Sequence, residues 1–126
     1  MEPLILAATD DTPEVHLDAG AGKFEFSGKS LPEDVTTFYQ PIFDWMDSYF
    51  ESPNDESIFV FKMTYFNTAS SKVILDVLMK LEEAVEDGKD VKVKWYFEED
   101  DEDMEEAGEE YSEIVEVPFE FIEMED

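Results

Sequence analysis

The sequence predicts a single α/β domain in which helices pack on a mixed β-sheet. Its 126 residues contain no internal repeat, and a chain of this length can bury about two-thirds of its unfolded surface around one core. Apolar residues make up 43% of the chain and aromatic residues 14%, whereas disordered acidic chains contain few aromatics. A strand, helix, strand pattern over residues 57–97 gives the domain its α/β character.

An antiparallel hairpin is expected near the N-terminus, after the short apolar run Leu4–Ala8. Residues 12–18 alternate apolar and polar side chains, with Val15 and Leu17 on one face, and residues 23–27 alternate again. The turn between these strands contains two glycines, at 20 and 22.

The first helix is expected to begin at Ser30 and to end near Phe50. Ser30 and Glu33 have the spacing of a capping box, in which each side chain satisfies a free backbone N–H of the first turn. Pro41 predicts a kink or a restart, because proline lacks the N–H of a helical hydrogen bond. The core face of the second part is predicted to consist of Ile42, Trp45, Met46 and Tyr49.

Residues 57–97 read as a parallel crossover unit. The near-continuous apolar run of residues 57–66 predicts a central strand buried on both faces. Apolar residues then recur every three or four positions up to Gly88, which is suited to a helix end, and residues 90–97 alternate as a strand. The apolar helix positions are Val73, Ile74, Val77, Leu78, Leu81, Ala84 and Val85. A last strand is expected over about residues 113–123, and Pro118 predicts an edge position for it.

The segment from Glu98 to Glu110 is acidic at ten of thirteen positions. Calcium binds several carboxylates, but its usual loop needs glycine at the sixth position and glutamate at the twelfth. A loop that starts at Asp101 has Glu106 and Ser112 at these positions. We therefore interpret the segment as a solvated acidic turn or short helix, and we predict no metal site.

The formal net charge of −27 restricts the partners. Such a surface repels nucleic-acid phosphates and anionic lipids, so we expect no direct binding to nucleic acid or membrane and instead expect protein partners with basic patches. No apolar run reaches about 18 residues, and the first residues lack the pattern of a secretion signal, which predicts a cytoplasmic protein. The absence of cysteine agrees with a reducing compartment and excludes thiolate chemistry.

Catalysis finds little support in the sequence. His16 is the only histidine, and its position opposite Val15 and Leu17 predicts an exposed or edge residue. No glycine-rich phosphate loop follows a strand, and no cofactor is expected. A carboxylate-based hydrolase would need a pocket with perturbed carboxyl groups. We therefore expect a protein that is not an enzyme.

Polar side chains, three of them hydroxyls, follow the central strand directly: Asn67 and Thr68 come first, and Ser70, Ser71 and Lys72 follow. A helix N-terminus has free N–H groups and a partial positive charge, so a hydroxyl here can cap the helix or, once phosphorylated, place an anion at that charge. Lys72, four residues after Thr68, could contact a phosphate on it. Capping alone and a phosphorylation switch both fit this pattern.

Several segments together resemble the SiaC family of bacterial regulatory phosphoproteins. They are Ala8-Thr9, Thr12–Val15, Gly28–Glu33, Pro41–Trp45, Tyr65–Lys72, Val93–Tyr96 and Glu106–Glu110. The resemblance spans nearly the whole chain, so residues 1–126 are expected to form one SiaC-like regulatory domain. Its most specific part is Asn67–Ser70, where the family's phosphoacceptor threonine falls on Thr68.

The resemblance implies a partner-switching circuit. A serine/threonine kinase of the anti-sigma-factor type would phosphorylate Thr68, and a PP2C-type phosphatase would reverse this. The unphosphorylated form would bind and activate an effector, a diguanylate cyclase, which links the switch to cyclic di-GMP and biofilm formation. The logic is similar to that of anti-sigma-factor antagonists with STAS-like folds. Two features depart from the family: Ala69 replaces a serine often found beside the acceptor, and residues 98–110 are unusually acidic.

The net charge also permits functions of another class. The chain could be an acidic decoy that mimics nucleic acid, or it could be another kind of acidic protein-binding module. Binding by a decoy should weaken steeply with salt whatever the state of Thr68. Binding by a switch protein should respond chiefly to Thr68→Asp or Thr68→Ala.

Overall fold

A computed structural model describes residues 1–125 of the chain, which form six strands and three helices. Their bounds are β1 Leu4–Leu6, β2 Glu14–Asp18, β3 Lys23–Ser30, α1 Val35–Tyr49, β4 Ser57–Phe66, α2 Thr68–Glu86, β5 Val91–Glu98, α3 Glu102–Ile114 and β6 Phe119–Met124. The predicted single α/β domain with a mixed sheet is confirmed.

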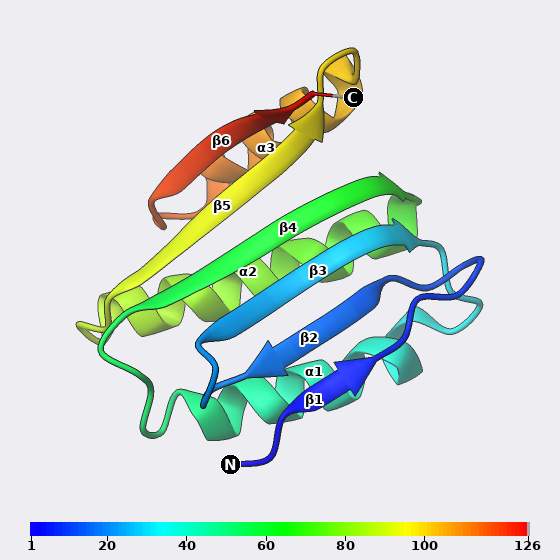
Figure 1. Cartoon of the computed structure of the whole chain (residues 1–126). Coiled ribbons are helices and arrows are strands. Elements are labelled where there is room, and N and C mark those ends of the chain that lie inside the picture. The colour runs from blue at the N-terminus through cyan, green and yellow to red at the C-terminus, as the bar shows by residue number, and fades with distance from the viewer. Residues whose placement is uncertain (126) are drawn as a thin grey trace.

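The six strands form one sheet in which spatial order follows chain order, from β1 to β6 (Figure 1). The strands β1, β2 and β3 pair antiparallel, and Gly22 at φ 66° forms the β2–β3 turn, so the predicted N-terminal hairpin is confirmed. The pairs β3–β4, β4–β5 and β5–β6 are parallel, and a helix connects each of them.

All three helices lie on the same face of the sheet (Figure 1). Parallel crossovers are nearly always right-handed, and here each one steps to the next strand in the same direction, so each helix comes to the same side. The prediction that β4 is buried on both faces is therefore wrong. Phe59 and Phe61 point to the helices and are buried, whereas Ile58 and Val60 face the open side and are half-buried.

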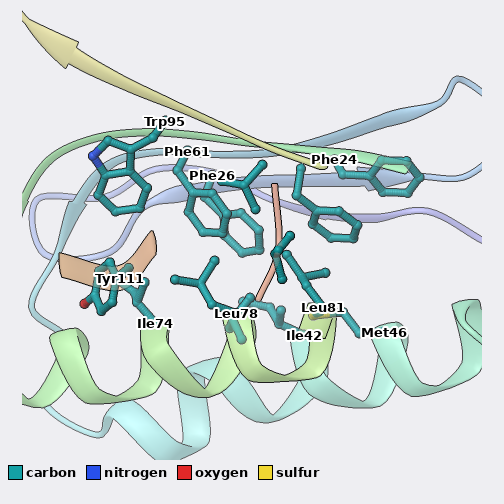
Figure 2. Close-up of a cluster of buried hydrophobic side chains, with 14 of the residues drawn as sticks. Phe24, Phe26, Ile42, Met46, Phe61, Ile74, Leu78, Leu81, Trp95 and Tyr111 are labelled. Atoms are coloured by element: carbon teal, nitrogen blue, oxygen red, sulfur yellow. The ribbon is translucent and has the colours of Figure 1, made fainter. Parts of the chain in front are cut away.

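The core lies between the sheet and the helices (Figure 2). Aromatic rings stack across neighbouring strands, with centroids 4.8 Å apart for Phe24 and Phe59 and 4.9 Å apart for Phe26 and Phe61. The predicted helix faces are confirmed: Ile42, Trp45, Met46 and Tyr49 of α1 are buried, as are Val73, Ile74, Val77, Leu78, Leu81 and Ala84 of α2. Of the predicted α2 face, Val85 alone is only half-buried.

The first helix starts later than predicted, and it is a single helix on both sides of Pro41. Ser30 is the buried last residue of β3 and not a cap, because β3 continues beside β4 as far as the Ser30–Phe66 pair. Asp34 is the N-cap, and its carboxylate accepts a hydrogen bond from the Thr37 amide at 3.1 Å, which lowers the pKa of that carboxyl. The helix then continues through Pro41 without a restart.

The unit from β4 to β5 has the predicted order of strand, helix and parallel strand. The end of α2 is closed by Gly88 at φ 88°, whose N–H donates to the Val85 carbonyl at 3.0 Å, while the Lys89 N–H donates to the Ala84 carbonyl at 2.9 Å. The strands β4 and β5 then pair in parallel, with Phe59 opposite Val93.

The acidic segment forms α3, a helix of 13 residues, so the prediction of a strand over residues 113–123 is wrong in its first half. Asp101 caps α3 by accepting from the Met104 amide at 3.0 Å. The strand β6 starts only at Phe119, directly after Pro118, and is an edge strand as predicted. Pro118 lacks an N–H but uses its carbonyl, which accepts from the Val93 N–H at 2.8 Å.

Candidate functional site

The start of α2 lies at the end of β4 and is capped by Asn67. The side-chain oxygen of Asn67 accepts a hydrogen bond from the Ser70 amide at 2.9 Å, and the backbone carbonyl of Asn67 accepts one from the Ser71 amide at 2.8 Å. The Asn67 N–H donates to the Ser30 carbonyl at 3.2 Å and so ties the cap to β3. The cap is therefore Asn67 and not one of the hydroxyl side chains, and Thr68 is the first helical residue.

Ser70 points into the core. Its hydroxyl accepts a hydrogen bond from the Ser30 hydroxyl at 2.9 Å, and Ser30 also shares a hydrogen bond of 2.7 Å with the Tyr39 hydroxyl. Ser30 and Ser70 are fully buried, and burial raises the pKa of Tyr39 to about 12. A kinase cannot reach the Ser70 hydroxyl unless the start of α2 unfolds.

Ser71 is bound to α3. Its hydroxyl shares a hydrogen bond of 3.1 Å with the Tyr111 hydroxyl, which in turn donates to the Ser71 carbonyl at 2.7 Å. Burial raises the pKa of Tyr111, so its hydroxyl remains a neutral donor at physiological pH. The pair connects the start of α2 to α3, and it engages both the hydroxyl and the carbonyl of Ser71.

Thr68 is the exposed hydroxyl at this end of α2, and within residues 1–125 its side chain makes no hydrogen bond to protein. It lies beside a hollow of about 500 Å³ between the starts of α1 and α2. The lining residues are Val35, Thr36, Thr68, Ala69, Lys72, Val73 and Asp76. Lys72 is exposed, and among the described residues no carboxylate lies within 4.0 Å of its ammonium group. The structure thus brings Thr68 and Lys72 together on the surface and separates them from Ser70 and Ser71.

A β-bulge precedes this site and was not foreseen from the sequence. Met63 pairs with Gly28 and Tyr65 with Lys29, so Thr64 is an extra residue in β4. Beyond the bulge Tyr65 is 51% exposed, whereas strict alternation from Met63 would bury it. A continuous apolar run contains no signal for a bulge, because either register keeps apolar residues inside.

A second hollow, of about 430 Å³, lies between the end of β4 and α3. It is lined by Thr64, Tyr65, Phe66, Asp101, Asp103, Met104 and Ala107.

In residues 1–125 no group of three or more His, Asp or Glu side chains is arranged to hold a metal ion, and residues 101–112, considered above as a calcium loop, are mostly helical. His16, expected at an exposed or edge position, is half-buried in β2 opposite Ile5. Within the described residues, no helix has the length and apolar character needed to span a bilayer.

Comparison with known proteins identifies close structural relatives. A family model described as SiaC family regulatory phosphoprotein matches residues 6–124. An uncharacterized protein of Pseudomonas aeruginosa strain UCBPP-PA14 is 29% identical over 119 residues, which are 94% of each chain.

Two solved structures extend this similarity to the whole fold. Apo-SiaC from Pseudomonas aeruginosa superposes with a TM-score of 0.88 at 29% identity, over 97% of this chain and 99% of that one. The second structure is the diguanylate cyclase SiaD in complex with its activator SiaC from the same organism. It matches with a TM-score of 0.90 at 28% identity, over 96% of this chain and 99% of that one.

Proposed function

The chain belongs to the SiaC family of regulatory phosphoproteins, and we propose that it is a non-enzymatic switch protein whose binding to an effector depends on phosphorylation of Thr68. The effector is a diguanylate cyclase, by likeness to the SiaC–SiaD complex of Pseudomonas aeruginosa. The unphosphorylated form binds and activates the cyclase, and phosphorylation releases it. A kinase of the anti-sigma-factor type adds the phosphate, and a PP2C-type phosphatase removes it.

The observation that carries this proposal is the difference in accessibility among the hydroxyls at the start of α2. Ser70 is buried and bonded to Ser30, and Ser71 is bonded to Tyr111, whereas Thr68 is exposed. A kinase needs an acceptor hydroxyl that can enter its active site. Thr68 meets this condition without unfolding of the helix.

A phosphate on Thr68 would change the surface and leave the fold intact. It would add about 1.5 to 2 negative charges at the first helical position, where the N–H groups of Thr68 and Ala69 have no intrahelical acceptor. The helix dipole and the nearby Lys72 would stabilise that charge. An effector that covers this surface would have to remove water from the phosphate, which disfavours the complex.

The first test is mass spectrometry of the protein purified from its native host. We expect one phosphate localised to Thr68, and we expect it to be absent from Thr68→Ala and retained in Ser71→Ala. Both variants should keep the circular dichroism of the wild type, because neither side chain forms part of the apolar core. A protein that remains unmodified across growth conditions and with a co-expressed kinase would overturn the proposal and leave Thr68 as an ordinary residue of the first helical turn.

A further inference from the structure

We infer that the hollow between the end of β4 and α3 is the docking site of the effector, and that it accepts an apolar anchor flanked by basic side chains. This inference rests on the proposed function, since it assigns the hollow to the same partner. It adds a surface and a chemistry that the phosphorylation site does not define.

The hollow exists because the sheet splits at this end (Figure 1). The β4–β5 ladder ends at the Phe61–Trp95 pair, although β4 continues to Phe66 and β5 continues to Glu98. Beyond the split, β5 remains paired with β6, with Glu98 opposite Met124. On the side away from β3, the last residues of β4 therefore face α3 across an opening of about 430 Å³ and do not pair with β5.

The bulge at Thr64 supplies an aromatic side chain for this opening. The bulge shifts the register by one residue, so Tyr65 points outward and Phe66 points inward. The ring centroids of Phe66 and Tyr111 are 6.4 Å apart. Bulges are uncommon between parallel strands, and they often re-aim a side chain beside a functional site. Exposed tyrosines are frequent anchors of protein interfaces, because their rings contribute large contact area at low entropic cost.

The lining of the hollow specifies the chemistry of its occupant. Tyr65, Met104 and Ala107 provide apolar walls, and among residues 1–125 the charged lining residues are Asp101 and Asp103. The exposed acids Glu102 and Glu106 continue the negative charge along α3. Charge complementarity therefore favours a partner segment that inserts an aliphatic or aromatic side chain and places lysine or arginine against the two aspartates.

The hollow is also close to the switch, because Phe66 lines it and Thr68 follows two residues later. An effector seated against Tyr65 would cover the start of α2. A phosphate on Thr68 lies outside the apolar walls and would lose its hydration in the complex. Docking and phosphorylation would thus act on adjoining surfaces.

The test measures the dissociation constant for the purified diguanylate cyclase of the SiaD type from the same organism, by isothermal titration calorimetry. The variants are Tyr65→Ala, which removes the anchor, and Asp103→Lys, which reverses the charge at the hollow. Glu109→Lys is the matched control, because it makes the same charge reversal on an exposed position of α3 that does not line the hollow. Asp101 is left unchanged because it caps α3.

We expect Tyr65→Ala and Asp103→Lys each to weaken binding about tenfold or more, and Glu109→Lys to change it less than about threefold. Thr68→Glu should also weaken binding. If Thr68→Glu weakens binding to the cyclase but Tyr65→Ala and Asp103→Lys bind it as tightly as the wild type, this inference is wrong and the proposed function stands. If the wild type does not bind the cyclase at all, both are overturned. Circular dichroism of each variant checks that the fold is kept.

Discussion

Three buried hydroxyl groups determine where the start of α2 lies. Ser30, Tyr39 and Ser70 come from β3, α1 and α2, and their hydrogen bonds of 2.7 and 2.9 Å join these elements inside the core. Within residues 1–125 no buried side-chain nitrogen or oxygen lacks a partner. A fully satisfied network of this kind gives a buried polar cluster one preferred geometry. Thr68 is therefore presented from a fixed helical turn.

Removing one member of this network should destabilise the fold. In Tyr39→Phe the ring stays but the Ser30 hydroxyl loses a partner, so we expect the free energy of unfolding to fall by about 1–2 kcal/mol. Urea denaturation followed by circular dichroism measures this change. The control Tyr65→Phe removes an exposed hydroxyl and should stay within about 0.5 kcal/mol of the wild type. Equal stability of the wild type and Tyr39→Phe would mean that water replaces the lost hydroxyl.

Tyr39 also predicts a loss of stability at high pH. Burial raises its pKa from the ordinary value of 10.0 to about 12, so between these values the unfolded chain has released a proton that the folded chain still holds. The stabilising contribution is complete below pH 10 and is lost as the pH rises through about 12. Unfolding of the wild type should therefore depend on pH more steeply in this window than unfolding of Tyr39→Phe, by at most about 1.4 kcal/mol per pH unit. Identical pH profiles would contradict the assignment.

At the scale of elements, α3 packs unusually close to the sheet. A methyl group built at Gly108 would lie 2.5 Å from the indole of Trp95, and the Trp95 ring N–H donates to the Met104 carbonyl at 2.9 Å. Glycine at position 108 therefore allows the helix to approach the ring. This approach also sets the width of the hollow that Met104 and Ala107 line.

Gly108→Ala should separate α3 from Trp95. Alanine raises helix propensity by about 1 kcal/mol, but the overpacking costs about 1–3 kcal/mol, so we expect a net loss of stability with a changed near-ultraviolet signal from Trp95. The control is Gly20→Ala, whose added methyl would meet its nearest neighbour, an Asp18 carboxylate oxygen, at 3.5 Å. It should unfold at nearly the same urea concentration as the wild type. A Gly108→Ala protein as stable as this control would mean that α3 can shift freely.

The elements that the sequence predicted correctly are those with a single strong period. In the span from β4 through α2 to β5, the helix was predicted from apolar residues at every third or fourth position and β5 from alternation, whereas β4 was predicted from its continuous apolar run, which gave the strand but not its one-sided burial. For α3 the same signal was present at Met104, Gly108 and Tyr111, but the carboxylates between them favoured an interpretation by charge alone. At the candidate site, the sequence predicted Thr68 as the phosphoacceptor, which stays a prediction, and the structure places Asn67 as the helix cap beside it. The sequence could not identify Tyr65, because its exposure follows from a bulge, nor the bonding of Ser70 and Ser71 to residues far away in sequence.

Over the whole molecule the few positive charges are concentrated on the face of the sheet that no helix covers. Four of the eight basic residues, Lys23, Lys62, Lys92 and Lys94, lie there at alternate strand positions. Three of them form ion pairs: Lys23 and Lys62 both pair with Glu25, at 3.6 and 3.0 Å, and Lys92 pairs with Glu120 at 2.8 Å. The Lys92–Glu120 pair raises the pKa of the amine and lowers that of the carboxyl, but exposed pairs add little stability. Most of the excess negative charge therefore lies elsewhere, including the exposed acids of α3.

This imbalance predicts that salt stabilises the fold. With a net charge of −27 the compact state repels itself more than the expanded unfolded chain does. Raising sodium chloride from about 0.01 M to about 0.15 M shortens the screening length from about 30 Å to about 8 Å, which removes repulsion across the molecule. The midpoint of unfolding in urea, an uncharged denaturant, should therefore rise with salt.

The double variant Glu106→Gln, Glu109→Gln tests the origin of this effect, because it removes two exposed charges of α3 beyond its first turn without touching the core. At low salt the double variant should reach its unfolding midpoint at a higher urea concentration than the wild type. The increase of this midpoint with salt should be smaller for the variant. A wild-type midpoint that falls with salt would show that the exposed ion pairs, such as Lys62 with Glu25, outweigh the repulsion. In that case the acidic surface would be locally balanced, and the long-range attraction for a basic partner would be correspondingly weak.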